Sequence, residues 1–392
     1  MTRPLVRITS RLFAPEVAAA AFRLRTLAQA FADSGCVVDV LTTVPPKGSA
    51  PADDGALRVS RWPAMRDENG NIRGYVQYLS YDLPLALRTM LRGRPDLYVV
   101  EPPPTTGAVM RLVTLVQRRP YVWFAADIWS EASSAAGAPG WVSAGLRWVE
   151  ARVLRGAAVV LSISDGVTAK VRELGVPAER IVTVGNGVDT SVFHPDGPRA
   201  SAPGPYFVYT GTMSEWQGAT VFVEALAEHR RRGGSSRLVF LGQGSELPHL
   251  RALAARLAPG AVDFPGVVPP AEAAEWLRGA QAALVSIRPG LGYDFAKPTK
   301  IYAATGCGTP VVFAGAGASR QLVSSERLGW AVDHDVTAVA DAMDAAASGT
   351  ASPAAGHLVE WTAGNASLSA ACRGAVDEVL QRLGMPSGRL PA

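Results

Sequence analysis

A lysine stands at the start of a helix in the second half of the chain. The segment KPTKIYAATGCGTPVV, residues 297–312, predicts a helix that begins near Thr299, after a strand that ends near Pro289. A helix N-terminus offers free N–H groups and the positive end of a dipole, which suit a nucleotide diphosphate. Lys300, in the first turn, would add a full positive charge. The alternative interpretation is a capped helix with a solvated lysine.

A carboxylate follows a predicted strand in the first half of the chain. The segment YVWFAADIWSE places Asp127 just beyond the strand end. There its carboxylate could accept a hydrogen bond from an acceptor hydroxyl or remove its proton. The alternative is an aspartate that caps the next turn.

The elements that must position these residues follow from the alternation of strand-like and helix-like runs. This alternation fills residues 1–190 and 206–365, and a Pro- and Gly-rich linker at 191–205 separates the two stretches. The pattern predicts an α/β protein with two Rossmann-like domains, each a parallel sheet covered on both faces. A last helix, at about 366–384, is predicted to return to the first domain. Because ligands bind beyond the carboxyl ends of such strands, we expect a cleft with one ligand for each domain.

Composition excludes several other classes of protein. The 392 residues carry a net charge of +4, without a dense Lys/Arg stripe, so a nucleic-acid partner is not expected. Neither half has GxGxxG after its first strand, and no GxxxxGK[ST] occurs, which disfavours dinucleotide and P-loop enzymes. Three separated cysteines indicate neither a disulfide framework nor a zinc site. With no signal peptide and no apolar run of about 18 residues, a cytoplasmic location is predicted.

A basic surplus in the first half raises the question of lipid binding. The helix AGLRWVEARVLRG could face anionic lipid, but we assign Trp148, Val149, Val153 and Leu154 to the core. The sequence therefore predicts at most a peripheral membrane contact.

The order of several motifs resembles glycosyltransferase family 4, the retaining GT-B enzymes, from about residue 5 to about residue 384. The segment GNGVDTSVFHP, residues 185–195, is similar to the N-G-V-D-x-x-x-F-x-P between the domains of that family. Residues 297–312 resemble the P-S-K-[LI]-[FY]-E motif of its lipid-linked and surface-sugar branch. The resemblance implies a nucleotide-diphosphate sugar donor in the second domain and a small-molecule or lipid-linked acceptor in the first. It also implies transfer with retention, with no cofactor and no required metal.

The resemblance also implies a set of donor-binding positions, spread over four segments of the second domain. FVYTGTMSEWQ resembles the glycine turn that faces the diphosphate, FLGQGSELPHL resembles G-x-G-x-x-x-x-L, and DFPGVVP resembles F-x-G-x-V. The expected donor-binding residues are Gly211, Thr212, Gln217, Gly242, Gly244, Val267, Asp294, Thr299 and Ala303.

Two departures from the family weaken the resemblance. Thr212 and Gln217 stand where many members carry Arg and Lys, and Arg288 is the candidate substitute. Ala303 stands at the position of the glutamate that binds the donor ribose. The catalytic candidates are accordingly Asp127, Lys300 and Arg288.

The acceptor loop departs from the pattern too. FAPEVAAAAFRLR resembles P-P-x-x-G-G-x-x-x-R, with Glu16 and Arg23 kept as acceptor-binding candidates and alanines in place of the glycine pair. Because alanine does not readily adopt a positive φ, this loop should follow a different path.

Two other functions stay open. A non-catalytic GT-B homologue that binds a sugar nucleotide or a partner enzyme would fit the missing charges. A GT-B phosphorylase or epimerase-like enzyme is disfavoured, because no lysine stands in a setting that suggests a cofactor Schiff base.

Overall fold

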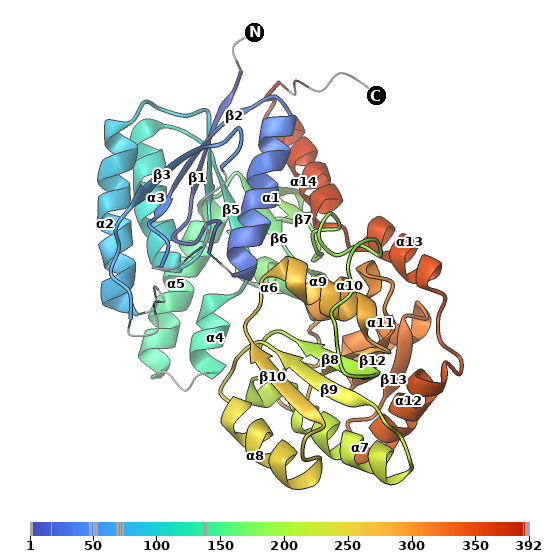
Figure 1. Ribbon diagram of the computed structural model, residues 1–392. Coiled ribbons are helices and arrows are strands. Elements are labelled where there is room, and N and C mark those ends of the chain that lie inside the picture. The colour runs from blue at the N-terminus through green and yellow to red at the C-terminus, as the bar shows by residue number, and fades with distance from the viewer. Residues whose placement is uncertain are drawn as a thin grey trace. The chain divides into compact units, whose positions relative to one another are not determined.

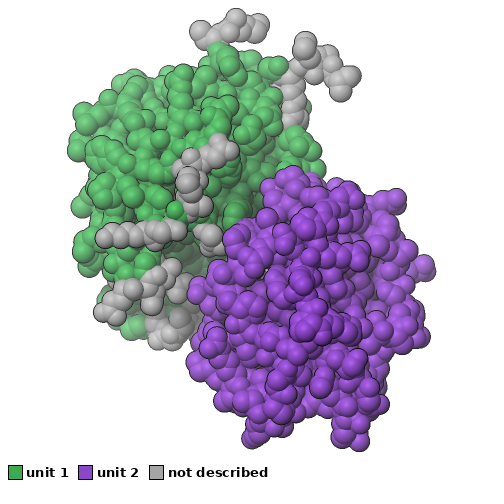
Figure 2. All heavy atoms as spheres, in the orientation of Figure 1, with its two compact units in different colours: residues 1–185, 368–392 green, residues 186–367 purple. Residues whose placement is uncertain are grey.

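The computed structural model describes residues 3–16, 18–46, 49, 54–67, 70, 72, 74–135, 139–386 and 388. The chain forms two compact units. Unit 1 comprises residues 1–185 and 368–392, and unit 2 comprises residues 186–367 (Figure 2). Each unit is built around its own parallel sheet, and the two are described separately below.

Unit 1 contains a seven-stranded sheet with the order β3-β2-β1-β4-β5-β6-β7. Every pairing in it is parallel. The direction of winding reverses between β1 and β4, because β2 and β3 lie on one side of β1 and the later strands on the other. The strands are β1 (Leu5–Thr9), β2 (Val37–Thr43), β3 (Arg58–Trp62), β4 (Leu97–Val100), β5 (Tyr121–Ala125), β6 (Val159–Ser162) and β7 (Ile181–Thr183).

Helices cover both faces of this sheet. They are α1 (Ala19–Asp33), α2 (Tyr75–Leu91), α3 (Pro104–Gln117), α4 (Trp129–Ala135), α5 (Gly140–Gly156), α6 (Asp165–Glu173) and α14 (Leu368–Arg382), with a 3-10 turn η1 (Ala178–Arg180). The C-terminal helix α14 lies beside α1 (Figure 1), and the two share one core layer with one face of the sheet. The other layer lies against α2, α3 and α5. Strands such as β5, YVWFA, are buried on both faces and are therefore continuously apolar.

Unit 2 contains a six-stranded parallel sheet with the order β10-β9-β8-β11-β12-β13, which reverses between β8 and β11. Its strands are β8 (Tyr206–Thr210), β9 (Arg237–Leu241), β10 (Val262–Gly266), β11 (Ala283–Ser286), β12 (Val311–Ala314) and β13 (Gly329–Val332). Its helices are α7 (Thr220–Arg231), α8 (Leu247–Leu257), α9 (Pro270–Gly279), α10 (Thr299–Gly306), α11 (Gly317–Ser325), α12 (Val336–Ser348) and α13 (Ala355–Asn365), with a 3-10 turn η2 (Glu215–Gln217). They form two core layers, one on each face of the sheet.

The predicted fold class is confirmed: the chain folds into two Rossmann-like α/β units. One core assignment was wrong. Val153 and Leu154 of α5 are buried as predicted, but Trp148 is 59% exposed. Its position in the helix places it on the outer face, which the amphipathic pattern did not distinguish from the inner one. No helix of the described part of the chain combines the length and the apolar character that crossing a membrane requires.

Candidate functional site

The carboxyl ends of the strands in unit 2 bring most of the predicted donor residues together. The winding reverses between β8 and β11, so the loops after these two strands diverge and leave room between them. The loop after β8 begins at Gly211, and the loop after β11 contains Arg288 and leads to α10. This switch point is the expected place for a ligand in an open α/β sheet.

Lys300 lies at this point, in the first turn of α10. Its Nζ atom is shielded from solvent and has no hydrogen-bond partner among the described residues. It lies 3.7 Å from the centroid of the Tyr209 ring. Tyr209 stands near the end of β8, just before the glycine loop. A Cβ atom on Gly211 would lie 3.9 Å from Nζ. Burial lowers the pKa of Lys300 to about 7, because no carboxylate offsets the cost of desolvating its charge.

The two glycine turns hold each other in place beside Lys300. Gly211 N–H donates to the carbonyl of Leu241 at 2.7 Å, and Met213 N–H donates to that of Gln243 at 2.9 Å. A Cβ on Gly242 would meet the Gly211 oxygen at 2.0 Å, and one on Gly244 would meet the Met213 oxygen at 2.1 Å. Both glycines are therefore needed for the close approach of one loop to the other.

Arg288 and Asp294 belong to the loop that joins β11 to α10. Arg288 N–H donates to the Trp216 carbonyl at 2.8 Å, which fixes the start of this loop, while its side chain is exposed. The Trp216 and Tyr293 rings stack at 4.6 Å between centroids. Asp294 is half-buried, and its Oδ1 is a shielded acceptor with no partner in the described structure.

The remaining donor candidates have different surroundings. Gln217 is buried, and its Oε1 accepts from Ser214 N–H at 3.2 Å and from the Tyr209 hydroxyl at 3.1 Å, so this carbonyl stabilises the loop itself. Ala303 is buried in a core layer of unit 2, one turn beyond Lys300. The exposed candidates are Thr212, Val267 and Thr299.

The carboxyl ends of the strands in unit 1 gather carboxylates and arginines. Ser10 follows β1, Glu101 follows β4 and Asp127 lies just beyond β5. The Ser10 hydroxyl donates to Glu101 Oε2 at 2.5 Å. Burial raises the pKa of Glu101, against the opposing effects of the Ser10 hydrogen bond and of Arg23 and Arg11. Desolvation also raises the pKa of Asp127, opposed by Arg23. The Asp127 side chain is accessible to solvent.

Arg23 of α1 is the cation of this cluster. Its guanidinium lies 6.0 Å from the Phe124 ring centroid, and its Nε is shielded and without a partner in the described structure. Glu16, the other acceptor candidate, is buried in an ion pair with Arg66 at 2.7 Å. Arg66 also donates to the Val44 carbonyl at 2.7 Å, so the Glu16 carboxylate helps to hold the loop beyond β3.

Sequence reasoning missed four residues of these two edges. Glu101 and Ser10 could have been found by the signal that identified Asp127, a polar residue directly after a buried strand. Arg11 lies against the rings of Tyr78 and Trp129, at 4.8 and 5.5 Å from their centroids. Its role and that of Tyr209 depend on contacts between distant segments.

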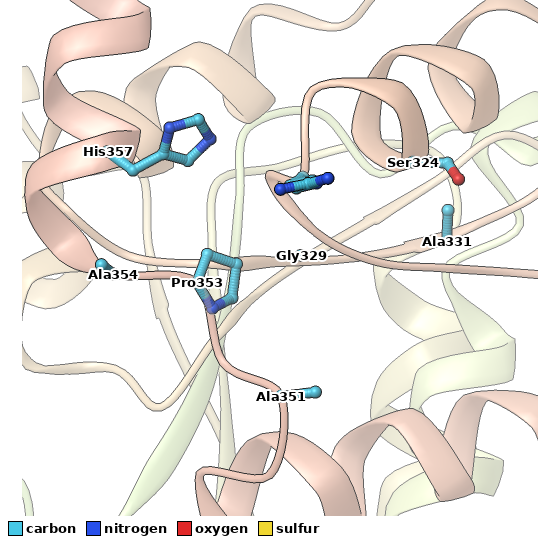
Figure 3. Close-up of a pocket in the computed structure, with 8 residues that line it drawn as sticks. Ser324, Gly329, Ala331, Ala351, Pro353, Ala354 and His357 are labelled. Carbon is cyan, nitrogen blue, oxygen red and sulfur yellow. The ribbon is translucent and has the colours of Figure 1, made fainter.

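A separate surface pocket of about 440 Å³ lies at the opposite edge of the unit 2 sheet (Figure 3). It is lined by the end of α11, by Gly329 at the start of β13, by the loop before α13, which includes Pro353, and by His357 in the first turn of α13. His357 is engaged there with the Glu326 carbonyl at 2.8 Å. None of the predicted site residues lines this pocket.

Comparisons with known proteins agree with this architecture. Residues 19–187 match the family described as glycosyl transferase 4-like domain, and residues 204–348 match glycosyl transferases group 1. The chain therefore belongs to the group 1 glycosyltransferases of the GT-B fold. A D-inositol 3-phosphate glycosyltransferase of Xylanimonas cellulosilytica is 33% identical over 216 residues, 47% of this chain and 49% of that protein. The chain spans about half the length of the curated relatives it matches.

Two solved structures share the fold across almost the whole chain. The sucrose-phosphate synthase of Thermosynechococcus elongatus has a TM-score of 0.75 at 17% identity, covering 97% of this chain and 100% of that one. HepE of Anabaena, solved with UDP and glucose, has a TM-score of 0.69 at 16% identity over the same shares.

Proposed function

We propose that this protein transfers a sugar from a nucleotide-diphosphate sugar to an acceptor hydroxyl, with retention at the anomeric carbon. The observation that carries the proposal is Lys300, a shielded cation without an anionic partner, in the first turn of α10 at the switch point of unit 2. Membership of the group 1 family and the UDP bound by HepE support a nucleotide-sugar donor. Retention rests on the family resemblance alone.

Lys300 would act on the leaving diphosphate. Negative charge accumulates on that group as the bond to the sugar breaks, and a preorganised cation in a shielded site stabilises it at little reorganisation cost. A pKa of about 7 leaves the free amine partly neutral at neutral pH. A bound diphosphate would favour the ammonium form, so binding should be accompanied by proton uptake.

Arg288 would supply the second charge. Its backbone is fixed by the hydrogen bond to Trp216, while the guanidinium is exposed beside the same loop. Free N–H groups at the start of α10, next to Thr299, would bind the phosphate oxygens. This arrangement uses no metal, and we expect none to be required.

The edge of unit 1 would hold the acceptor. Asp127 is accessible and could accept a hydrogen bond from the attacking hydroxyl, and Arg23 opposes the rise that desolvation causes in the pKa of this carboxyl. Glu101 and Ser10 would fix the loops on which the acceptor rests. A small molecule and a lipid-linked sugar both satisfy this chemistry. A cytoplasmic location is part of the proposal, supported by three buried, unpaired cysteines.

A second candidate is a non-catalytic GT-B subunit that binds a sugar nucleotide or a partner enzyme. The observation that favours it is Gln217. Where many relatives carry a charge, this chain has a neutral side chain whose carbonyl oxygen is already engaged with Tyr209 and Ser214. Ala303, within the core, offers no carboxylate to the ribose.

Nucleotide release separates the two candidates. The protein would be incubated with a panel of UDP-, dTDP- and GDP-sugars, and the free nucleotide would be measured with and without candidate acceptors. A transferase should release nucleotide slowly into water and faster with an acceptor. Binding without release would favour the non-catalytic subunit, and the absence of binding by every nucleotide sugar would contradict both.

A further inference from the structure

The outer surfaces of α2 and α3 carry an unusual set of side chains. Every exposed side chain that the structure describes on these two helices is apolar. On α2 they are Val76, Leu79, Leu83, Leu87, Met90 and Leu91, spaced three or four residues apart along most of the helix. On α3 they are Leu112, Leu115 and Val116. A helix at a protein surface normally presents charged residues to water.

These side chains form one surface. Helix α2 packs along α3, and α3 packs along α5, so the three helices lie side by side on one face of unit 1 (Figure 1). Helix α5 adds two exposed tryptophans, Trp141 and Trp148. We refer to the nine apolar residues and the two tryptophans as the apolar face. Single exposed apolar residues are common on proteins, but a contiguous group of this kind indicates an interaction site.

The described charges around the apolar face are mostly cationic, and the exposed acidic residue beside the ends of α2 and α3 is Asp96, which pairs with Arg119 at 3.7 Å. Arg92 and Arg94 follow the end of α2, Arg118 follows α3, and Arg152 of α5 lies 4.4 Å from the Trp148 ring centroid. Arg147 is also exposed on α5.

The acidic residues of these helices are inside the protein. The described parts of α2, α3 and α5 expose no aspartate or glutamate. Asp82 is buried against Thr106 at 2.5 Å, and Glu150 is buried against Ser130 at 2.6 Å. An apolar surface with a mostly cationic border complements an anionic surface that has an apolar layer beneath it.

We propose that the apolar face binds the surface of an anionic lipid bilayer, with α2 and α3 lying in the interfacial plane. At 1.5 Å per residue, α2 is about 25 Å long, which suits a helix that rests in the headgroup region. Leucines enter the acyl boundary, tryptophans prefer the interface, and arginines bind lipid phosphates. This surface is independent of the donor site in unit 2.

Vesicle sedimentation of the full chain tests the proposal. Vesicles of phosphatidylcholine alone would be compared with equal parts of phosphatidylcholine and phosphatidylglycerol. We expect binding to the mixed vesicles, much weaker binding to pure phosphatidylcholine, and a decrease as salt is raised. The absence of binding to the mixed vesicles at low salt would overturn the proposal.

Two double variants test which residues are responsible. The variant with Leu83→Gln and Leu87→Gln should bind the mixed vesicles at least about tenfold more weakly, since two buried leucines are lost. The variant with Arg94→Gln and Arg118→Gln should lose about fivefold for each arginine. A matched control changes an exposed pair on α8, Arg256→Gln and Leu257→Gln, and should bind as the unmodified protein does. If both double variants bind the mixed vesicles as well as the control and the unmodified protein do, the apolar face is not the lipid-binding surface.

The same variants distinguish a membrane from a second copy of the chain. All substituted positions are exposed, so melting temperatures should be unchanged and a binding loss cannot be attributed to unfolding. Sedimentation velocity would then give the oligomeric state without lipid. A dimer that the Leu83→Gln, Leu87→Gln variant converts to a monomer would overturn the lipid assignment.

Discussion

The carboxyl edges of the two sheets have the same topology and opposite chemistry. In unit 2 the shielded charge is a lone lysine beside two interlocked glycine turns, and no carboxylate contributes to its pKa. In unit 1 the buried carboxylates have side-chain partners: Glu101 accepts a hydrogen bond from Ser10, and Glu16 is paired with Arg66. The fold places loops at both switch points, and the side chains decide what each can bind.

The difference between the two edges indicates which kind of ligand each one can bind. A shielded cation without a partner carries a cost that an anionic ligand removes, which is expected of a diphosphate site. An edge that holds both carboxylates and arginines offers hydrogen bonds without a strong net charge. That suits a neutral, hydroxyl-bearing acceptor. Substitutions at either edge can therefore break or support this contrast.

The largest expected effect concerns stability. Between pH about 7 and 10.5 the unfolded chain keeps a proton that folded Lys300 has released, so the free energy of unfolding rises with pH across this window. Below it, the buried charge destabilises the fold. Lys300→Met should therefore stabilise the protein at pH 6, by at most about 5 kcal/mol, with a smaller gain near pH 10. Urea unfolding at both pH values measures this. If Lys300→Met changes the free energy of unfolding equally at pH 6 and near pH 10, the Lys300 ammonium group is solvated.

The second prediction concerns turnover. Lys300→Ala should lower the rate of sugar transfer by at least about tenfold, or about 1.4 kcal/mol of transition-state stabilisation, with the fold unchanged. Lys170→Ala is the control, because that lysine is already paired with Glu131 and Glu173 on the surface of unit 1. Full activity in a well-folded Lys300→Ala protein would remove this residue from the mechanism.

The third prediction addresses the edge of unit 1. Asp127→Asn should lower the transfer rate severalfold while leaving the affinity for the nucleotide unchanged, since the residue is assigned to the acceptor. Steady-state kinetics with the acceptor varied, together with calorimetric titration of UDP, provide both numbers. A variant that loses UDP affinity yet transfers normally at saturation would place Asp127 in the donor site.

The smallest expected effect concerns recognition of the ribose of the donor nucleotide. A glutamate that accepts hydrogen bonds from ribose contributes about 1.5–3 kcal/mol, and Ala303 cannot make this contribution. The protein should therefore discriminate between UDP and dTDP by less than about tenfold. Side-by-side titrations measure this, and the Asp294 carboxylate is the group to examine if the ratio is larger. A hundredfold preference for UDP would show that another residue reads the ribose.

The sequence predicted the features that depend on local pattern. Two parallel-sheet units followed from the alternation of buried strands and amphipathic helices, and the helix start at Thr299 and Lys300 followed from a short motif. A serine directly before a helix is a typical N-cap, and Ser164 at the start of α6 accepts from Val167 N–H at 3.2 Å.

Features that depend on distant contacts were not predictable in this way. Ser10 and Glu101 are 91 residues apart in the sequence, and only the sheet order makes their loops neighbours. The side-chain carbonyl of Gln217 accepts a hydrogen bond from the hydroxyl of Tyr209, which extends from β8. The exposure of Trp148 could not be distinguished from burial, because an amphipathic pattern does not say how far a neighbouring helix extends.

Proton-linked binding of UDP would show whether Lys300 belongs to a diphosphate site. Calorimetric titrations in buffers of different ionisation enthalpy would give the affinity and the number of protons taken up at pH 7 to 8, for the unmodified protein, Lys300→Met and Lys170→Met. We expect proton uptake by the unmodified protein, a loss of at least about tenfold in UDP affinity for Lys300→Met, and an unchanged affinity for Lys170→Met. Equal UDP affinities for all three proteins, without proton uptake, would contradict a diphosphate site at Lys300.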